Sequence, residues 1–338
     1  MTVLVTGGAG YIGSHMVHAL ADAGERVVVL DNLSTGFDWA IPKGVPLIIG
    51  ETGDQALVAG LIAQHAVDVV IHFAASIVVP DSVSDPLGYY RNNTVNSRAL
   101  IETAVKGGVR HFIFSSTAAV YGNPAKVPVD EDDTTQPVSP YGSSKLMTEI
   151  MLRDAGRAHA LGHVILRYFN VAGADPKLRT GQSTKGATHL IKVAVETALG
   201  RRDKMHVFGT DYPTPDGTCM RDYIHVTDLV RAHSDALAYL RGGGASRTLN
   251  CGYGHGFSVL GVIEAVKQVA KVDFRVELGD RRPGDPAQIV AASNRIRSVL
   301  GWRPQFDDLA TIVSHALAWE RELMAQSNTA QPLISLEK

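Results

Sequence analysis

The stretch "VLVTGGAGYIG" (3–13) joins a short apolar run to a segment with the periodicity of a helix. Gly7, Gly10 and Gly13 give it a G-x-x-G-x-x-G spacing. Glycines at such a strand-to-helix turn let the backbone bend tightly and approach a ligand, and the positive end of the helix dipole attracts phosphate. We therefore predict that this turn holds the pyrophosphate of a dinucleotide. The alternative is a glycine turn that serves only to pack the helix on its strand.

An acidic residue follows at the spacing expected for a ribose contact. Asp31 ends the second apolar run, "RVVVLD" (26–31), 18 residues after Gly13. A carboxylate at this place accepts hydrogen bonds from the adenosine ribose and repels a 2′-phosphate. The sequence therefore predicts NAD rather than NADP as the cofactor.

Short apolar runs alternate with helix-like segments along the first half of the chain. Nearly continuous apolar runs of this length are typical of parallel strands that are buried on both faces. We predict an α/β fold with a doubly wound, parallel Rossmann-type sheet over residues 1–173. After the first run at 3–6, its strands are expected at 26–31, 46–50, 68–74, 111–116 and 163–170.

The pattern loosens in the second half of the chain. Two long loops rich in Gly and Pro, 174–189 and 208–223, interrupt it; loops of this length in a compact protein are usually functional or disordered. Helix-like segments return beyond them, and Thr227 is the predicted N-cap of one. We predict a smaller, mixed α/β substrate lobe over 174–325, from which later segments can return to the first domain, and a loosely attached tail over 326–338.

The composition argues against several classes of protein. The chain has 338 residues, 45% of them hydrophobic, and a formal net charge of −2, so no overall basic field favours nucleic acid or an anionic membrane. Cys219 and Cys251 are its two cysteines; they do not make a disulfide framework, and no Cys/His spacing predicts a metal site. No leader peptide or membrane span is recognised in the sequence. We expect a reduced, cytoplasmic protein.

A tyrosine and a lysine lie one helical turn apart in "SPYGSSK" (139–145). Tyr141 and Lys145 are expected to be neighbours because side chains at i and i+4 share one face of a helix. A nearby ammonium and a bound nicotinamide cation would both lower the pKa of the phenol, which is ordinarily about 10. Tyr141 is therefore the predicted catalytic acid/base, assisted by Lys145. The alternative is an ordinary surface helix with a solvated lysine.

The glycine spacing and the Y-x-x-x-K pair together resemble the extended short-chain dehydrogenase/reductase superfamily. In that superfamily a hydroxyl at the end of the strand at 111–116 hydrogen-bonds the reacting oxygen, and the matching residue here is Thr117. Further stretches, among them "LDNLSTG", "FIFSSTAAVYG", "LRYFNVAGA" and "FGTDYPTPDGTCMRDYIHVTDL", resemble the UDP-glucose 4-epimerase family over nearly the whole chain. Ala118 and Ala119 stand where the sister 4,6-dehydratases have an Asp-Glu pair.

The resemblance implies an NAD-dependent isomerase that interconverts UDP-glucose and UDP-galactose. In that reaction C4 of the sugar is oxidised, the 4-keto sugar rotates about its link to the diphosphate, and C4 is reduced on its other face while NAD stays tightly bound. The family usually forms homodimers through the helices near 88–106 and 141–156. The implied partners are therefore a UDP-sugar substrate and a second copy of the chain.

The resemblance also implies site residues by position. For the cofactor, besides the three glycines and Asp31, these are Tyr11, Ile12, Asn32, Glu51, Thr52, Phe73, Ala74, Asn92, Lys145 and Tyr168. For the substrate, besides Thr117 and Tyr141, they are Asn170, His189, Phe208, Arg221, Arg282 and Asp285. Arg221 and Arg282 match ligands of the diphosphate, although either one alone would be a solvated surface arginine. For Phe73 and Tyr168 the alternative is a plain core role.

Several positions depart from the family pattern. Glu51 and Thr52 stand where many members have Asp-Ile beside the adenine, and Ile77 stands where some have a phosphate-binding Lys. His189 occupies a position that is often Asn, with a helix-start His as the alternative. Ile289 lies at the position that gates the sugar pocket, where a large aromatic residue excludes N-acetyl sugars. The open alternatives are an epimerase of UDP-GlcNAc/GalNAc, UDP-xylose/arabinose or UDP-glucuronate, an NAD-dependent sugar-nucleotide reductase, and a nucleotide-sensing regulator.

Overall fold

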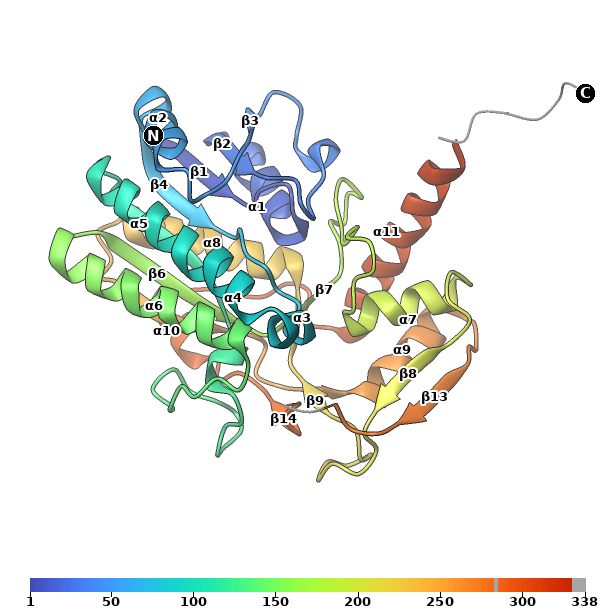
Figure 1. The fold of residues 1–338 in the computed structure, drawn as a ribbon. Coiled ribbons are helices and arrows are strands. Elements are labelled where there is room, and N and C mark those ends of the chain that lie inside the picture. The colour runs from blue at the N-terminus through green and yellow to red at the C-terminus, as the bar shows by residue number, and fades with distance from the viewer. Residues whose placement is uncertain (283–284, 330–338) are drawn as a thin grey trace, which may run out of the picture.

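A seven-stranded sheet forms the centre of the computed structural model, which describes residues 1–282 and 285–329 (Figure 1). The strand order is β11-β6-β5-β4-β1-β2-β3, and every neighbouring pair is parallel. The predicted doubly wound Rossmann-type sheet is thus confirmed. Its strands are β1 (Thr2–Thr6), β2 (Arg26–Asp31), β3 (Leu47–Ile49), β4 (Val67–His72), β5 (His111–Thr117), β6 (Gly162–Tyr168) and β11 (Arg247–Cys251).

Helices cover both faces of this sheet (Figure 1). Side chains alternate along a strand, so Val3 and Val5 of β1 belong to one hydrophobic core and Leu4 to the other. Each core is completed by the helices that lie on its face. These are α1 (Tyr11–Asp22) and α8 (Val226–Arg241) on one side, and α2 (Gln55–His65), α5 (Asn96–Lys106) and α6 (Pro140–His159) on the other.

The strand order reverses between β1 and β4, and such a switch point leaves a crevice at the carboxyl ends of the strands. The two chain segments that follow these strands meet there. Phe73 N and Ala74 N, just after β4, both donate hydrogen bonds to the carbonyl oxygen of Thr6 at the end of β1, at 2.9 and 3.1 Å. The fold therefore brings the glycine turn and the residues after β4 to one edge of the sheet.

A smaller lobe of helices and short strands lies beside this edge. Three helices pack on one another there: α7 (Leu190–Ala198), α9 (Val259–Ala270) and α11 (Leu309–Thr329). The short strands form two-stranded parallel sheets and one mixed sheet, as predicted for a mixed α/β lobe. They are β7 (Asn170–Ala172) with β10 (Tyr223–His225), β8 (Met205–Phe208) with β13 (Val276–Gly279), and β12 (Phe257–Ser258) with β9 (Met220–Arg221) and β14 (Gln288–Ile289).

The lobe is discontinuous in sequence because part of the chain after residue 173 returns to the first domain. α8 packs on α1, β5 and β6, while β11 extends the large sheet beside β6. α10 (Asn294–Leu300) packs on α8 and on β11. The buried Trp302 fixes this return by donating from Nε1 to the carbonyl oxygen of Asp228 (2.9 Å). α8 starts one residue before Thr227, and its N-cap is His225, which accepts from Thr227 N, so Thr227 is not the cap.

The C-terminal segment begins as a helix rather than as a tail. α11 continues to Thr329, past the predicted start of the tail at 326, and residues 330–338 lie outside the described residues. Within residues 1–282 and 285–329, no helix combines the length and the apolar character needed to cross a membrane.

The helical segment after β4 changes its winding near the site. It consists of α3 (Val79–Ser84), α4 (Pro86–Tyr89), a π-helical turn η2 (Tyr90–Val95) and then α5. Asn93 in the π-turn is buried, and its side chain accepts from Ser76 N (2.8 Å) and donates to Ser76 O (2.9 Å) and Ser144 Oγ (3.0 Å). π-turns inside helices often mark functional sites, and this one ties the loop after β4 to the helix that carries Tyr141.

Candidate active site

The turn between β1 and α1 has no room for a side chain at Gly7 or Gly13. Gly7 has a φ of 71°, and a Cβ atom there would lie 2.5 Å from the backbone nitrogen of Ala74. A Cβ on Gly13 would lie 2.1 Å from the carbonyl oxygen of Gly7, and one on Gly10 would lie 3.3 Å from it. α1 begins with neither a side-chain cap nor an acidic residue in its first turn. Its first N–H groups, which include those of Tyr11 and Ile12, therefore fit an anionic pyrophosphate.

The carboxylate of Asp31 lies beside this turn and is buried. Oδ2 accepts a hydrogen bond from Ala9 N (2.9 Å), and Oδ1 accepts one from Leu33 N (2.8 Å). Because a carboxylate oxygen can accept two hydrogen bonds, each oxygen retains capacity for a ribose hydroxyl. The position and charge of Asp31 thus fit NAD and oppose a 2′-phosphate.

Three more residues are predicted to contact the adenosine part of the cofactor. Asn32 directly follows β2, while Glu51 and Thr52 follow β3. Asn32 donates from Nδ2 to Oε1 of the exposed Glu51 (3.0 Å), whereas Thr52 is buried. This hydrogen bond holds Glu51 beside the ribose end of the turn. The longer side chain of Glu51, compared with the Asp of many family members, is accommodated by its exposure.

Of the other residues predicted for the cofactor, Phe73 and Asn92 follow β4, and Tyr168, predicted to lie near the nicotinamide, ends β6. The ring of Phe73 packs against that of His233, with centroids 4.9 Å apart, so Phe73 has a packing role in this structure. Asn92 donates from Nδ2 to Ser76 Oγ (2.9 Å). Tyr168 is partly buried at the end of β6, and burial raises the pKa of its phenol far above the ordinary value, so it is neutral at physiological pH.

Tyr141, Lys145 and Thr117 meet where α6 begins beside the end of β5. Ser139 caps the helix by accepting a hydrogen bond from Gly142 N (3.2 Å). This start turns Tyr141 and Lys145 toward the sheet, where they are 8% and 2% exposed, and Thr117 is 8% exposed. Thr117 also hydrogen-bonds the Tyr141 phenol. The burial of Lys145 excludes the alternative of a solvated surface lysine.

The electrostatics of the pair differ from the sequence-based expectation that Lys145 lowers the pKa of Tyr141. Burial raises the pKa of Tyr141 to about 12, and the opposing influence is the hydrogen bond with Thr117. Burial also lowers the pKa of Lys145 to about 7. The physical reason is that both groups are desolvated, and the Nζ of Lys145 is engaged by the carbonyl oxygen of Ser115 (2.9 Å) and lies 4.9 Å from the ring centre of Phe114.

Two arginines predicted for the diphosphate lie close together in the second lobe. Arg221 donates from Nη1 to the carbonyl oxygen of Pro286 (2.8 Å), and its Nη2 lies 3.7 Å from Oδ1 of Asp285. Arg282 is exposed, and its Cζ lies 3.9 Å from the ring centre of Phe208. A hydrogen bond from Asp285 N to the Arg282 carbonyl oxygen (3.4 Å) links the Arg221–Asp285 contact to the Arg282–Phe208 contact. These four predicted substrate residues therefore form one surface cluster.

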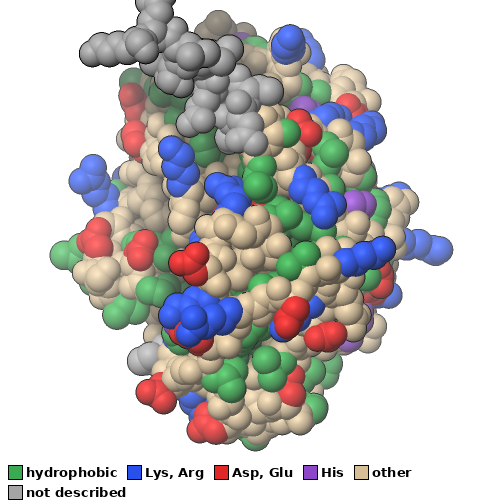
Figure 2. Space-filling model, turned by 90° about the vertical axis from the view of Figure 1, so that its right-hand side faces the viewer, with side chains coloured by type: hydrophobic (Ala, Val, Ile, Leu, Met, Phe, Trp, Pro, Cys, Tyr) green, Lys and Arg blue, Asp and Glu red, His purple; other side chains and the backbone are tan. Residues whose placement is uncertain are grey.

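The surface seen in Figure 2 carries no field of a single sign. Lys and Arg side chains are interspersed there with Asp and Glu, in keeping with the net charge of −2. An anionic ligand must therefore be held by local groups such as Arg221 and Arg282 rather than by long-range attraction.

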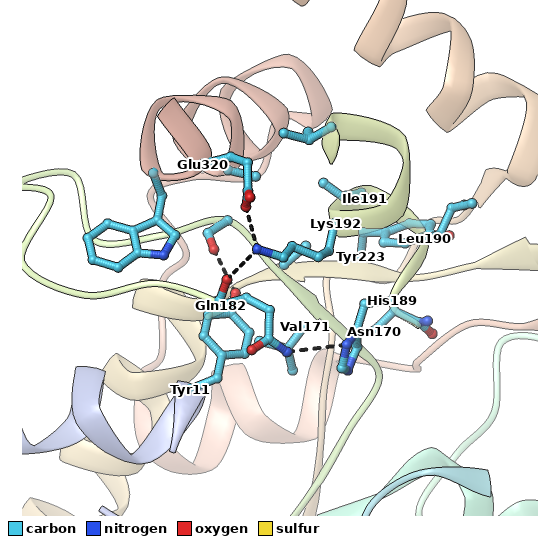
Figure 3. A pocket seen from close by; sticks show the side chains of 15 residues that line it. Tyr11, Asn170, Val171, Gln182, His189, Leu190, Ile191, Lys192, Tyr223 and Glu320 are labelled. Atoms are coloured by element: carbon cyan, nitrogen blue, oxygen red, sulfur yellow. Dashed lines mark hydrogen bonds and ion pairs between the residues drawn. The ribbon is translucent and has the colours of Figure 1, made fainter. Parts of the chain in front are cut away.

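Asn170 and His189, the other predicted substrate residues, line one cavity between the two lobes (Figure 3). Gln182 orients His189, with its Nε2 lying 3.3 Å from His189 Nδ1. At the back of the cavity Lys192 donates to the Gln182 carbonyl oxygen (2.9 Å) and forms a buried ion pair with Glu320. Sequence reasoning missed Gln182 and Lys192. A lysine in an amphipathic helix gives no signal of burial when its carboxylate partner is 128 residues away.

A small hydrophobic cluster lies between Thr117, one of the predicted catalytic residues, and Arg221, one of the predicted substrate residues. Ala118, which follows Thr117, packs with Phe169 and Ile289. Ile289 is paired with Arg221 in the β14–β9 ladder, and Phe169 precedes Asn170 on β7. The cluster thus brings the ends of β5 and β6 against the strands of the second lobe.

These features define the class of the protein: the sheet, the glycine turn and the Y-x-x-x-K helix are those of the short-chain dehydrogenase/reductase type. Residues 3–252 match the family model described as the NAD dependent epimerase/dehydratase family. The chain therefore belongs to the NAD-dependent epimerase/dehydratase family.

Relatives of known name are similar over almost their full length. A UDP-glucose 4-epimerase of Azospirillum brasilense is 59% identical over 321 residues, which cover 95% of this chain and 92% of the relative. The crystal structure of UDP-glucose 4-epimerase from Brucella ovis in complex with NAD has a TM-score of 0.91 at 41% identity and covers 94% of this chain and 97% of that one. The structure from Bifidobacterium longum in complex with NAD⁺ and UDP has a TM-score of 0.90 at 36% identity and covers 95% and 98%.

Within the part of the chain that the structure describes, no group of three or more His, Cys, Asp or Glu side chains could hold a metal ion. Cys219 and Cys251 are both free and buried.

The glycine turn yields a direct test of the cofactor site. Gly13→Ala should lose most of the NAD that the wild-type protein retains on purification, because its Cβ would force the Gly7 carbonyl out of a 2.1 Å contact and open the turn. NAD content is measured by enzymatic assay after acid release. Gly60→Ala, on an exposed face of α2 with open space around it, is the control for a Gly-to-Ala change as such. Full NAD content in Gly13→Ala would contradict the assignment.

Proposed function

We propose that this protein interconverts UDP-glucose and UDP-galactose by inverting C4 of the sugar, with NAD as a tightly bound cofactor. The observation that carries the proposal is the burial of Tyr141, Lys145 and Thr117 at the start of α6, in a fold that also has a dinucleotide-fitting turn and two neighbouring arginines. Relatives named UDP-glucose 4-epimerase, with up to 59% identity over 95% of the chain, support the choice of substrate.

The Oη of Tyr141, ionised as a phenolate, takes the proton of the sugar 4-OH, and after the sugar has turned it returns this proton to the C4 oxygen. The bound dinucleotide supplies the acceptor and then the donor of the C4 hydride. Thr117 hydrogen-bonds the reacting oxygen and keeps it beside the phenol. A Tyr141 pKa of about 12 leaves the phenol protonated in the chain by itself, so its ionisation requires additional positive charge at the site. Lys145 holds the nicotinamide ribose and contributes such charge when protonated.

Inversion of C4 requires that the nucleotide stays bound while the sugar turns. Arg221 and Arg282 hold the diphosphate with charge-assisted hydrogen bonds, and Asn170 and His189 hold its other side. Phe208 and Asp285 hold the uridine. The sugar turns about its link to the diphosphate over the small Ala118–Phe169–Ile289 cluster, where the absence of polar groups in these three side chains leaves no fixed hydrogen bond to either face.

The protein is also proposed to form a homodimer through its α4–η2 and α6 surface. Large hydrophobic side chains are exposed there, with Leu87 77%, Val95 55%, Met147 42% and Ile150 45% exposed. α4 and η2 both pack against α6, so these residues lie on adjoining elements. A second copy of the chain would cover them. The free thiols of two buried cysteines support a reducing, cytoplasmic location.

Tyr141→Phe tests the central assignment. The variant should lose at least about 10²–10⁴-fold in turnover of UDP-galactose, the usual contribution of a positioned acid/base, while it retains its NAD. The assay supplies no cofactor and detects UDP-glucose. Tyr239→Phe removes an exposed hydroxyl far from the site and should turn over like the wild type. A Tyr141→Phe variant with near-normal turnover would remove Tyr141 as the base, and wild-type protein that produces no UDP-glucose would refute the proposed function.

Arg281 and Arg282 are adjacent in the sequence and provide a matched test of nucleotide binding. Arg282→Ala should weaken UDP binding by ~2 kcal/mol, the magnitude of a lost hydrogen bond to a charged group, as measured by calorimetry. Arg281→Ala should have little effect, because Arg281 donates to Asp211 (2.6 Å) and lies over Tyr212 instead. Equal effects of the two substitutions would argue that only general positive charge matters.

The dimer is tested by placing a charge on its predicted surface. Ile150→Glu should convert a dimer to a monomer, because it would bury an uncompensated carboxylate at the contact. Light scattering after gel filtration gives the molar mass. Val272→Glu introduces the same charge at a position of similar exposure in the substrate lobe, at 43%, and should leave the mass unchanged. A monomeric wild-type protein would refute the proposal.

A further inference from the structure

A buried ion pair lies under the catalytic helix, and the mechanism above does not use it. Glu149 on α6 is 0% exposed and Arg167 on β6 is 3% exposed. Arg167 donates from Nη2 to Oε2 (2.7 Å) and from Nε to Oε1 (3.0 Å) of Glu149. Ser116 on β5 donates to the same Oε1 (2.5 Å), and Arg153 approaches Oε2 at 3.3 Å from the rim. The carboxylate is therefore fully hydrogen-bonded in a dry part of the molecule.

Such a pair is not needed to hold two strands and a helix together. Desolvating two charges costs as much as their attraction returns, and apolar residues of similar volume often serve stability as well or better. The large hydrophobic core on this face of the sheet already includes Leu152 of α6 and Ile165 of β6. The position of the pair therefore points to a role other than stability.

Glu149 lies on the same buried side of α6 as the two predicted catalytic side chains, Tyr141 and Lys145. Tyr141, Lys145 and Glu149 are spaced at i, i+4 and i+8, so they lie along one buried face of the helix. Lys145 and Glu149 also contact consecutive residues of β5: Nζ of Lys145 donates to the Ser115 carbonyl oxygen (2.9 Å), while Ser116 Oγ donates to Glu149. The carboxylate is thus fixed one helical turn beyond the ammonium, on the side away from Tyr141.

We propose that Glu149 is a positioning residue for Lys145: its carboxylate, held by Arg167 and Ser116, increases the charged fraction of the lysine and keeps its side chain directed at the end of β5. The proposal rests on the proposed function, in which the charged ammonium serves Tyr141 and the nicotinamide ribose. Glu149 itself touches neither substrate nor cofactor.

The other groups around Lys145 leave Glu149 as the source of this effect. Burial lowers the pKa of Lys145 to about 7, and the charge of Glu149 is the influence that raises it. His72 faces Lys145 from β4, but burial and the charge of Lys145 lower its pKa to about 3, so it is neutral. The ring of Phe114 lies under Nζ. The guanidinium of Arg167 is paired with Glu149 through Nη2 and Nε.

The test measures the protonation of Lys145 itself in the NAD-containing protein. Lysine labelled with ¹³C at Cε is incorporated, the Lys145 resonance is assigned by its loss in Lys145→Arg, and its chemical shift is followed from pH 5 to 10. In Glu149→Gln the midpoint should fall by about one pH unit or more, because an opposite charge near a buried ammonium favours its charged form. Glu149→Asp keeps the charge and should restore most of the shift.

Glu149→Gln leaves Arg167 buried without its partner and can fail to fold, so a second variant carries the same test. Glu149→Gln combined with Arg167→Met removes both charges, and its fold is checked by circular dichroism. Its Lys145 midpoint should also lie below that of the wild type. An unchanged midpoint in the folded double variant would overturn the proposal and leave the pair a purely structural feature.

The pH dependence of kcat/KM gives an independent readout. If Glu149 keeps Lys145 charged, its loss moves the alkaline limb of the profile to lower pH, and acidification recovers part of the activity. A purely structural defect lowers the rate equally at every pH with the limb in place, which would contradict the proposal. Failure of the proposed function is distinguishable, because a wild-type protein without epimerase activity still shows the Lys145 titration.

Discussion

The burial of an ionisable pair at the start of α6 is the constraint on which the site depends. Tyr141 and Lys145 lie almost wholly out of solvent, and desolvation moves their pKa values in opposite directions, to about 12 and about 7. Both shifts favour the neutral forms. Each unit represents about 1.4 kcal/mol between the two protonation states, so small changes in local charge decide which form is present. A site of this kind responds strongly to what binds beside it.

The two lobes complete this site from different parts of the sequence. Tyr11, in the first turn of α1, donates from its hydroxyl to the carbonyl oxygen of Gly173 (2.7 Å), where the chain leaves the first domain. The hydrophobic contact of Ala118 with Ile289 closes the other side. Tyr11 directly follows the glycine turn, and Ile289 is paired with Arg221 in the β14–β9 ladder. Because α8 and β11 return to the first sheet, the lobe is anchored on it at several points.

Much of this arrangement could be predicted from the sequence because it depends on local rules. The run from Val3 to Gly13 combines strand, turn and helix signals within a few residues, and Tyr141 and Lys145 are brought together by one helical turn. The direction of the Tyr141 pKa shift could not be predicted, because it depends on the depth of burial, a property of the whole fold. Lys192 and Glu149 were missed for the same reason: their charged partners Glu320 and Arg167 are distant in sequence, and a Lys or Glu in a helix is expected to be solvated until its neighbours are known. Gln182 lies in a loop whose path could not be predicted, although its partner His189 is close in sequence.

The charged network under α6 shows how a fold can accommodate a lysine whose charged form is disfavoured by burial. An ammonium with no carboxylate near it in a dry core loses its proton, and a direct Lys–Glu ion pair would hold the charge but turn the side chain away from the cofactor edge. In this structure the Glu149 carboxylate is instead claimed by Arg167 and Ser116, while Lys145 reaches Ser115, the preceding residue of the same strand. The Glu149 carboxylate therefore attracts the ammonium without forming an ion pair with it. The Nζ of Lys145 therefore bonds the backbone of β5 and leaves the carboxylate to Arg167 and Ser116.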